Sequence, residues 1–257
     1  MAKTFPSEVL NFINDCLKIS PKVISIKTTA DKIEGENFIL FLHPYSSYGE
    51  TINDAPNTSK KTLHIFEDLW QSRTEIYKNK IQSILGSNQT IAARACQIVK
   101  LDKINADAFF NKNHLHQSTT AGHKYGLIYK NKLVAAISFS KSRVMTDGQI
   151  YYRSYELIRF SNQLGYTVTG GLNKLLKHFI EEKNVQHLMT YIDLNWGDGK
   201  AFLDFGFKEN GQVLEIESYV DPSTHQRSKE NNLASNQQLL KVPHLGSKKL
   251  ILDLRNY

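Results

Sequence analysis

Apolar residues near the start of the chain recur at helical spacing. Between residues 7 and 17, the apolar positions are Val9, Leu10, Phe12, Ile13 and Leu17. Residues three and four apart share one face of a helix, so this segment is predicted to be an amphipathic helix. Pro21 follows closely and ends the pattern.

Short apolar runs come next. Residues 38–42 and 62–66 have the length and composition of buried strands, and residues 23–26 are a candidate partner strand. Residues 67–85 then carry an apolar stripe at helical spacing that stops at Gly86. A glycine directly after the last periodic residue is typical of a helix end, so one helix is predicted here.

The most informative stretch is 155–179, which combines an extended segment, a turn at Gly170 and Gly171, and an amphipathic helix. The helix stripe consists of Leu172, Leu175, Leu176 and Phe179. Free N–H groups at a helix start bind anions, and glycines let a phosphate approach the backbone. The turn is therefore a candidate phosphate site, although the same stripe would pack on a sheet whatever the turn did.

A second polar group follows the next predicted strand, residues 187–193. Asp193 ends that strand and Asn195 stands two residues later. A carboxylate at the carboxyl end of an inner strand often faces a ligand crevice. The alternative is that Asp193 caps the following helix.

Composition narrows the class of protein. The chain has 257 residues, of which 40% are hydrophobic, enough for one large domain or two small ones. Its formal net charge of +7 suits an acidic partner, either nucleic acid or the phosphates of a cofactor, although the basic residues are scattered. Cys16 and Cys96 form no metal or disulfide pattern, and no signal peptide or membrane span is evident, so a cytoplasmic protein is expected.

The C-terminal three-fifths of the chain resembles the GNAT superfamily of acyl-CoA-dependent transferases. The resemblance rests on the order strand, glycine turn, helix, strand, Asn195 and finally Gly206–Phe207. It implies that coenzyme A binds the turn, with acetyl-CoA or another acyl-CoA as cofactor, and that Asn195 lies near the pantetheine arm. Three positions depart from the family pattern: Thr167 stands where the family has a basic or amide residue, Leu172 replaces a small residue, and Phe202 stands where a tyrosine often acts as general acid.

The resemblance also implies the fold. Residues 92–101 would form the first strand, 105–111 a helix and 125–139 a hairpin, with 151–160 and 187–193 as the parallel fourth and fifth strands. Residues 249–253 would close the sheet edge after a loop-rich insertion from 209 to 245. The predicted class is α+β: a mixed, mostly antiparallel sheet flanked by helices, with a small α/β region before it.

Two domains are expected, residues 1–90 and residues 91–257. Residues 64–70, together with the helix that follows them, are similar to the C-terminal part of very-short-patch-repair-like nuclease domains. These domains occur in phage and mobile-element proteins and are often fused to a GNAT-like module. No Asp plus Glu-x-Lys spacing accompanies it. Residues 1–90 are therefore interpreted as an inactive remnant that still offers a docking surface for nucleic acid.

The candidate site residues fall into three sets. The catalytic candidates are Glu156, Arg159, Asp193 and Tyr191. The candidates for cofactor binding are Val168, Thr169, Gly170, Gly171, Leu172, Asn173, Lys174 and Asn195. Asn113 and His114 are candidates for acceptor binding, because residues 113–117 resemble an Asn-His motif of the phage-associated modules; no ligand spacing supports a metal.

Each catalytic candidate has a structural alternative. Acyl transfer from a thioester needs a neutral amine, so a base should lie near the acyl carbon, and Glu156 is on the strand where GNAT enzymes often place one. Glu156 could instead be a surface carboxylate or a partner of Arg153. Arg159 could meet a phosphate or hold Asp193 in a buried ion pair. Tyr191 could replace the acid missing at Phe202, or be a core tyrosine.

Two functions follow from these observations. The first is an acyl-CoA-dependent N-acyltransferase acting on a nucleic-acid or nucleobase-associated amine, which would make it a DNA-modifying enzyme related to phage proteins. The second is a noncatalytic nucleic-acid-binding accessory of a mobile-element nuclease. Leu172 and Phe202 favour the second function, whereas Asp193 and Asn195 favour the first.

Overall fold

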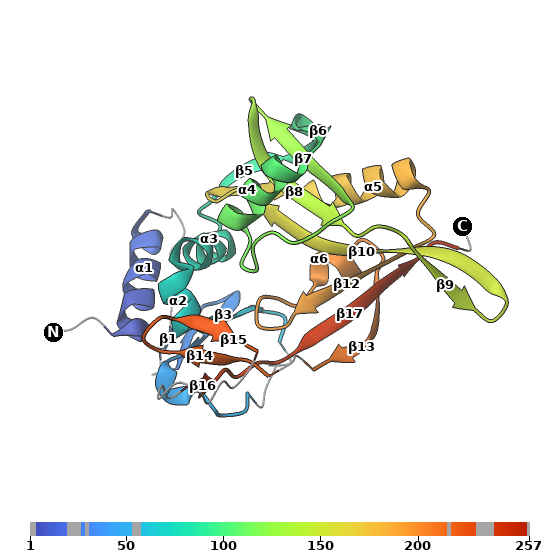
Figure 1. Ribbon diagram of the computed structural model, residues 1–257. Helices are drawn as coiled ribbons and strands as arrows, with labels where there is room; N and C mark the ends of the chain where they lie inside the picture. The colour runs from blue at the N-terminus through green and yellow to red at the C-terminus, as the bar shows by residue number, and fades with distance from the viewer. Residues whose placement is uncertain are drawn as a thin grey trace. The chain divides into compact units, whose positions relative to one another are not determined.

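The computed structural model describes residues 4–19, 27–28, 31–52, 58–214, 217–229 and 239–255 (Figure 1). The chain forms two compact units. The first unit comprises residues 1–87, 192–198 and 212–247, and the second unit comprises residues 88–191, 199–211 and 248–257. This division differs from the predicted domains 1–90 and 91–257, because two later segments return to the first unit.

The first unit is built from the N-terminal elements and a small C-terminal sheet. Its elements are α1 (Phe5–Ile19), β1 (Lys27–Thr28), β2 (Lys32–Glu34), β3 (Phe38–His43), η1 (Tyr45–Ser47), β4 (Lys61–Phe66), α2 (Glu67–Ser72), α3 (Thr74–Leu85), β14 (Tyr219–Asp221), β15 (Gln226–Ser228) and β16 (Leu240–Lys241). One sheet has the order β1-β2-β3-β4 and the other the order β15-β14-β16. The pair β3 and β4 is parallel and nearly all buried, which explains the continuous apolar runs.

Helix α1 forms as predicted and is longer at both ends. Phe5, Val9, Ile13 and Cys16 are buried, so one stripe faces the protein. Phe5 and Phe12 each contact the ring of Trp70 edge-on, and the Trp70 indole donates to Glu8 at 3.1 Å. The candidate strand at residues 23–26 lies outside the described residues.

The single helix predicted over residues 67–85 is two helices. The chain breaks at Arg73, whose φ and ψ are −134° and 34°. On either side, the Ser72 hydroxyl donates to the Asp68 carbonyl and the Thr74 hydroxyl to the Trp70 carbonyl. Hydroxyl side chains that bond to nearby carbonyls compete with the helix, which accounts for the interruption. Helix α3 ends at Gly86 in the left-handed conformation, as predicted.

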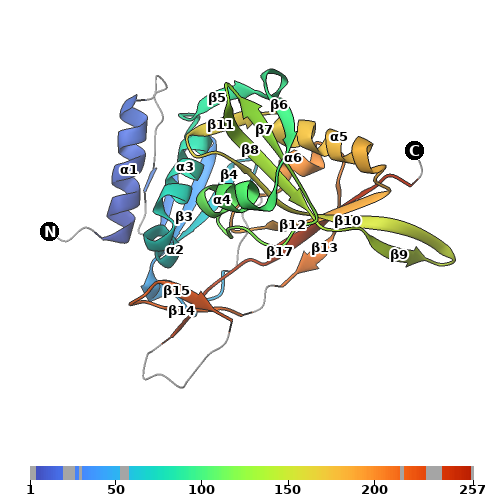
Figure 2. The same cartoon turned by 45° about the horizontal axis from the view of Figure 1, so that its top comes forward.

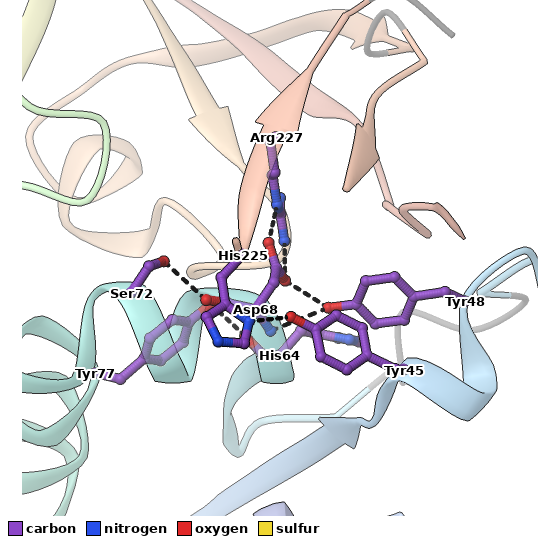
Figure 3. Close-up of polar contacts among 8 residues, drawn as sticks. All are labelled: Tyr45, Tyr48, His64, Asp68, Ser72, Tyr77, His225 and Arg227. Carbon is purple, nitrogen blue, oxygen red and sulfur yellow. Dashed lines mark hydrogen bonds and ion pairs between the residues drawn. The ribbon is translucent and has the colours of Figure 1, made fainter. Parts of the chain in front are cut away.

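The returning segment is held to the first unit by an apolar cluster and a buried ion pair. Tyr48, Phe66, Val220 and Val242 form one core cluster. Beside it, Asp68 is 0% exposed and receives two bonds from the Arg227 guanidinium, at 2.5 and 2.9 Å, and one from the Tyr48 hydroxyl (Figure 3). The region predicted as a loop-rich insertion, residues 209–245, therefore contains a small sheet that completes this core.

The second unit contains the large sheet. Its elements are β5 (Gln89–Ala92), η2 (Ala93–Ala95), β6 (Gln97–Lys100), α4 (Lys103–Asn113), β7 (His123–Tyr129), β8 (Lys132–Phe139), β9 (Arg143–Asp147), β10 (Ile150–Asn162), β11 (Tyr166–Thr169), α5 (Gly171–Lys183), β12 (His187–Asp193), α6 (Lys200–Leu203), β13 (Lys208–Val213) and β17 (Ser247–Asp253); the ends of β12, β13 and β17 fall in the first unit. The sheet order is β13-β17-β12-β10-β8-β7-β6, with β9 attached to β10. A short parallel pair, β5 and β11, stands apart.

Helices cover both faces of this sheet. Ala136 of β8 packs with Phe109 and Phe110 of α4, whereas the Phe139 ring of β8 stacks on Phe179 of α5 with centroids 3.6 Å apart. Residues three apart on a strand point to opposite faces, so α4 and α5 lie on opposite sides, as Figure 2 also shows. The predicted fold class, a mixed and mostly antiparallel sheet flanked by helices, is confirmed.

The predicted first strand, residues 92–101, is divided. Residues 89–92 pair with β11, a 3-10 turn follows, and only residues 97–100 join the large sheet. The hairpin around Lys130 forms as predicted, with Lys130 and Asn131 both at positive φ.

Candidate functional site

The predicted phosphate turn leads into helix α5 with no capping side chain. Gly170 is the N-cap residue, with φ 75° and ψ 7°, and the first intrahelical acceptor is its own carbonyl, which bonds to the Lys174 N–H at 3.0 Å. The N–H groups of Gly171, Leu172 and Asn173 therefore have no acceptor within the helix. Thr169 and Gly170 are exposed, so this end of the helix is open to solvent.

The fold itself also explains why each of these two turn positions is a glycine. Gly170 adopts the left-handed conformation, which other residues rarely tolerate. A Cβ atom at Gly171 would lie 3.1 Å from Val168 Cγ1 and 3.4 Å from Leu127 Cδ1, tighter than ordinary contact. The glycine pair is thus partly explained by the way α5 packs, and the N–H groups without an acceptor within the helix are the feature that this packing does not explain.

The other residues predicted to bind the cofactor differ in how far their side chains are exposed. The side chains of Val168 and Leu172 are buried, at 5% and 7% exposure, and Asn173 is exposed. Leu172 points into the core, so it does not obstruct the turn as its size alone suggests. The Lys174 ammonium donates to the carbonyls of Ala93 at 3.0 Å and Cys96 at 2.6 Å, which ties the η2 segment to the first turn of α5.

Strands β10 and β12 separate close to this turn. Their parallel pairing covers Ser154–Glu156 against His187–Met189 and goes no further. Beyond it, the Thr190 hydroxyl donates to the Leu157 carbonyl at 3.0 Å. On its other side, β10 pairs with β8 through Leu157 and then Arg159, so Ile158 is an extra residue in a β-bulge. The parallel ladder between the predicted fourth and fifth strands therefore ends at Glu156 and Met189, and an opening for a ligand beyond it stays a prediction.

No pattern in the sequence predicts the bulge or the role of Thr190. Bulges arise from how a strand meets its neighbour, and residues 155–160 carry no glycine or proline that would mark one. Because of this extra residue, the side chains of β10 after the bulge point to the opposite faces of the sheet from those that regular alternation would give. It therefore determines where Glu156 and Arg159 point relative to each other.

Glu156, Arg159 and His114 form one cluster in the second unit. The Arg159 guanidinium donates to the Gln117 carbonyl at 3.1 Å and to the bulged Ile158 carbonyl at 2.9 Å. Burial lowers the pKa of Arg159, and the carboxylate of Glu156 acts in the opposite direction. All three side chains are half-buried. Arg159 thus holds the loop that carries His114 over the bulge of β10.

His114 is a neutral imidazole in this setting. Burial, followed by the charges of Arg159 and His116, lowers the pKa of His114 to about 3. Its Nδ1 accepts the backbone N–H of His116 at 3.1 Å, so the proton of the neutral ring is on Nε2. His114 is therefore suited to donate a hydrogen bond and is unsuited to carry charge near neutral pH.

Asn113, the other acceptor-binding candidate, is committed to the fold. It is 6% exposed, its Nδ2 donates to the Phe109 carbonyl at 2.7 Å, and its Oδ1 accepts the Leu164 N–H at 2.9 Å. These bonds fasten the end of α4 to the segment after β10. Asn113 positions the neighbouring His114 and has no polar atom directed at a ligand.

Asp193 and Asn195 belong to the first unit. Asp193 Oδ1 accepts the Asn195 backbone N–H at 2.8 Å and its side-chain amide at 3.0 Å. Asn195 is 8% exposed, its Oδ1 accepts the Leu245 N–H, and its carbonyl accepts the His64 N–H. Both polar ends of the Asn195 side chain are therefore engaged in structural bonds.

Tyr191 and Phe202 complete the set of predicted positions. Tyr191 is 42% exposed on β12, so it is not a core tyrosine. Phe202 packs edge-on against Phe207 with centroids 5.6 Å apart. The Phe202 ring therefore has an apolar packing role in the second unit, as a tyrosine there would also have.

Neither a metal centre nor a membrane helix emerges. In the part of the chain that the structure describes, no three His, Cys, Asp or Glu residues are grouped so that they could hold a metal ion. Among the described helices, none is long and apolar enough to cross a membrane.

Comparisons with known proteins give matches to solved structures alone. No family model and no curated protein matches the chain. The ribosomal-protein-S18-alanine N-acetyltransferase of Escherichia coli matches with 14% identity and a TM-score of 0.36, over 63% of this chain and 96% of its own. A Bacillus subtilis acetyltransferase in complex with CoA has 12% identity and a TM-score of 0.37, over 62% and 99% of the two chains.

A third match is Arabidopsis thaliana Naa50 in complex with a bisubstrate analogue, with 10% identity and a TM-score of 0.39 over 62% of this chain and 99% of its own. TM-scores below 0.5 at such low identity do not establish the family or the activity of this chain. The functional argument therefore rests on the geometry of the second unit.

Proposed function

We propose that the chain is an acyl-CoA-dependent N-acyltransferase of the GNAT type, with its site in the second unit. The observation that carries the proposal is the parallel pair β10 and β12, which stops pairing after Glu156 and Met189 and is joined through an uncapped helix start at Gly170. Free N–H groups and the positive end of a helix dipole suit a pyrophosphate. The residues proposed to hold it are Thr169 to Asn173, through their backbone.

The proposed chemistry uses four side chains of this chain. Bound acyl-CoA would supply a thioester as the acyl donor. Glu156 accepts the proton that the amine must lose, as a general base next to the strand opening. His114 donates its Nε2–H to the acceptor, and Arg159 holds the 114–117 loop in position. Tyr191, exposed on β12, is the hydroxyl proposed to protonate the leaving thiolate.

The acceptor proposed is an amine carried by a nucleic acid or nucleobase. The formal net charge of +7 supports an acidic partner. Because His114 is neutral, it can bind the acceptor through a hydrogen bond. Recognition of the acceptor then needs no negatively charged side chain. Asn113, Asp193 and Asn195 have no part in this proposal, because their hydrogen bonds stabilise the fold.

A thermal-shift titration with acetyl-CoA and CoA tests the cofactor site. Binding to the folded state stabilises it by about 2.7 kcal/mol at a ligand concentration of 100 times Kd, so the melting temperature should rise. Gly170→Asp puts a carboxylate at the helix start and should abolish the shift. Gly86→Asp is the matched control, since Gly86 has nearly the same φ, 73° against 75°, at the end of α3.

The results of this titration distinguish cofactor binding at the helix start from binding elsewhere and from an effect of backbone strain. If the wild-type chain shows no shift at millimolar acetyl-CoA, the transferase proposal is wrong. If Gly170→Asp keeps the full shift, cofactor binds elsewhere and the helix start is not its site. Equal loss in both variants would point to backbone strain, which the unliganded melting temperatures report separately.

A second candidate is a noncatalytic nucleic-acid-binding protein, and one observation favours it. Asn195, expected beside the pantetheine arm, has both ends of its side chain engaged in the first unit. This candidate predicts a gel shift with duplex or single-stranded DNA whose affinity falls steeply with salt, without any acetyl-CoA response. Binding that is absent at 50 mM salt would exclude it.

A further inference from the structure

A β-hairpin arm extends from the large sheet of the second unit. It consists of β9 and the first residues of β10, from Arg143 to Arg153, and both cartoon views show it reaching past its neighbours in that sheet (Figures 1 and 2). Every residue of β9 is exposed. Nothing in the proposed transferase chemistry uses this arm.

The arm exposes large apolar side chains. Val144 is 69% exposed, Met145 43%, Ile150 66% and Tyr151 73%. These four account for half of the large apolar residues that are exposed in the described part of the chain. A concentration of apolar surface on one projecting element is typical of an interaction site.

The arm is held in place along its length. Arg255 stacks on the Tyr152 ring at 4.2 Å and pairs with Asp147 at 3.1 Å. The Gln186 side-chain carbonyl accepts the Arg153 N–H at 3.0 Å. A strand fixed in this way offers its outer edge in a defined orientation, which lowers the entropy cost of binding.

The outer edge of β9 has no strand beside it. Among the described residues, β9 is hydrogen-bonded to β10 alone. An unpaired edge with exposed apolar side chains is a template for another strand. The five residues of β9 therefore offer a strand edge, flanked by apolar side chains, to which a partner strand can bond.

The charge pattern of β9 identifies that partner. The strand reads Arg143, Val144, Met145, Thr146, Asp147, with a cation at one end and an anion at the other. An identical strand laid antiparallel about Met145 brings each Arg143 opposite the other copy's Asp147, twice. Within the described residues, no carboxylate pairs with Arg143, and Asp147 is 66% exposed despite its bond to Arg255.

We propose that two copies of this chain dimerise by antiparallel pairing of their β9 strands around a two-fold axis at Met145. The two hairpins then form one continuous sheet in the order β10-β9-β9-β10. Cross-strand neighbours share a face of a sheet, so Tyr152 and Met145 of each copy line up in one apolar row. On the opposite face, Val144 and Arg153 of one copy lie beside Thr146 and Tyr151 of the other.

This pairing satisfies the rule that a two-fold interface is self-complementary. A partner of different sequence would need an anion and a cation at the same two positions, four residues apart on an extended strand. A nucleic acid would meet Arg143 and Arg153 favourably but would be repelled by Asp147. The second copy is the occupant that pairs every charge on the edge strand.

The first test measures mass in solution. Light scattering coupled to size exclusion should give twice the chain mass of 29.4 kDa for the wild type. Arg143→Asp and Asp147→Arg should each weaken dimerisation at least tenfold, because each places like charges opposite each other twice. The double variant Arg143→Asp/Asp147→Arg restores both pairs and should restore the dimer.

Arg94→Asp is the matched control, because Arg94 is an exposed arginine of the same unit outside the arm. It should leave the dimer intact. Circular dichroism and melting temperature establish that each variant is folded. The dimer proposal is wrong if the wild type remains a monomer at 100 µM, or if both single charge reversals stay as dimeric as the wild type.

The second test determines the register of the two paired β9 strands. Opposed residues of antiparallel strands have Cα atoms about 4.5–5.5 Å apart, within reach of a disulfide. Met145→Cys should therefore cross-link to its own copy under oxidised glutathione, whereas Thr146→Cys, about 8 Å from its counterpart, should not. Cys16 and Cys96 are buried and do not compete. A dimer in which Thr146→Cys cross-links and Met145→Cys does not would overturn the proposed register.

Discussion

Two polar clusters, one in each unit, resemble each other in composition and differ in what their groups contact. In the first unit, Asp68 is fully buried and is bonded by Arg227 and Tyr48 (Figure 3). In the second unit, Glu156 and Arg159 are half-buried, and the Arg159 guanidinium bonds to carbonyls of the main chain. One cluster pairs its opposite charges directly, and the other keeps its carboxylate apart.

The difference separates polar groups that stabilise a fold from polar groups available to a ligand. A buried carboxylate with three donors has its bonding capacity filled, and removing any partner leaves an uncompensated charge. A half-buried carboxylate beside a strand opening keeps its lone pairs for a substrate. We expect substitutions in the first cluster to change stability and substitutions in the second cluster to change turnover.

The largest effect is expected at Glu156. Glu156→Gln removes the proposed base while keeping the size of the side chain, so acyl transfer should slow by roughly 10²–10⁴ times. Release of free CoA in the presence of an amine panel or DNA measures the rate. Glu181→Gln, an exposed change on α5, is the control. A rate within twofold of the wild type would remove Glu156 from the mechanism.

The next effect is on stability, in the other cluster. Asp68→Ala leaves the half-buried Arg227 without its partner and should lower the free energy of unfolding by about 3–5 kcal/mol. Urea denaturation measures this loss. Asp204→Ala breaks the exposed pair with Lys200 and should cost less than about 1 kcal/mol. If the two variants are equally stable, the buried pair does not hold the first unit together.

Acid should destabilise the first unit through a buried histidine pair. His43 Nε2 and His64 Nδ1 lie 2.9 Å apart, and burial lowers the pKa of His43 to about 4 and that of His64 to about 3. The unfolded chain therefore binds more protons than the folded chain below pH 6.5. Stability is complete above that pH and falls as the pH is lowered, by up to about 1.4 kcal/mol per pH unit for each imidazole, to about pH 4 for His43 and about pH 3 for His64.

Unfolding measured between pH 7 and pH 4 checks this sign and range. His64→Phe keeps the aromatic stack with Phe41 and removes one of the two titrating groups, so it should reduce the slope. Stability that rises as the pH falls from 6.5 would contradict the buried, neutral pair.

Local patterns predicted the secondary structure well. The stripe of α5, the glycine stop after α3 and the polar turn at Lys130 all depend on residues close together in the sequence, and each appears as expected. The exposed turn at Gly170 was also found in this way. Its significance for a phosphate remains a prediction, because the fold explains why both glycines are there.

Contacts between distant residues were beyond the reach of the sequence. Nothing local in Asn195 indicates that Leu245 will bond its amide, and nothing in Asp68 indicates Arg227. The bulge at Ile158 arises from pairing with β8, which no local pattern encodes. For this reason the family resemblance assigns Asn195 to cofactor binding, whereas its hydrogen-bond partners in the structure belong to the fold.

The discontinuity of the first unit has a consequence for biosynthesis. Its core cluster joins Tyr48 and Phe66 to Val220 and Val242, and Asp68 meets Arg227. While the ribosome extends the chain from residue 87 to residue 242, these early residues lack their late partners for roughly ten to thirty seconds at about 5–20 residues per second. During that interval the second unit also lacks residues 248–257, which include most of strand β17, so neither unit can complete its core before the last residues are made.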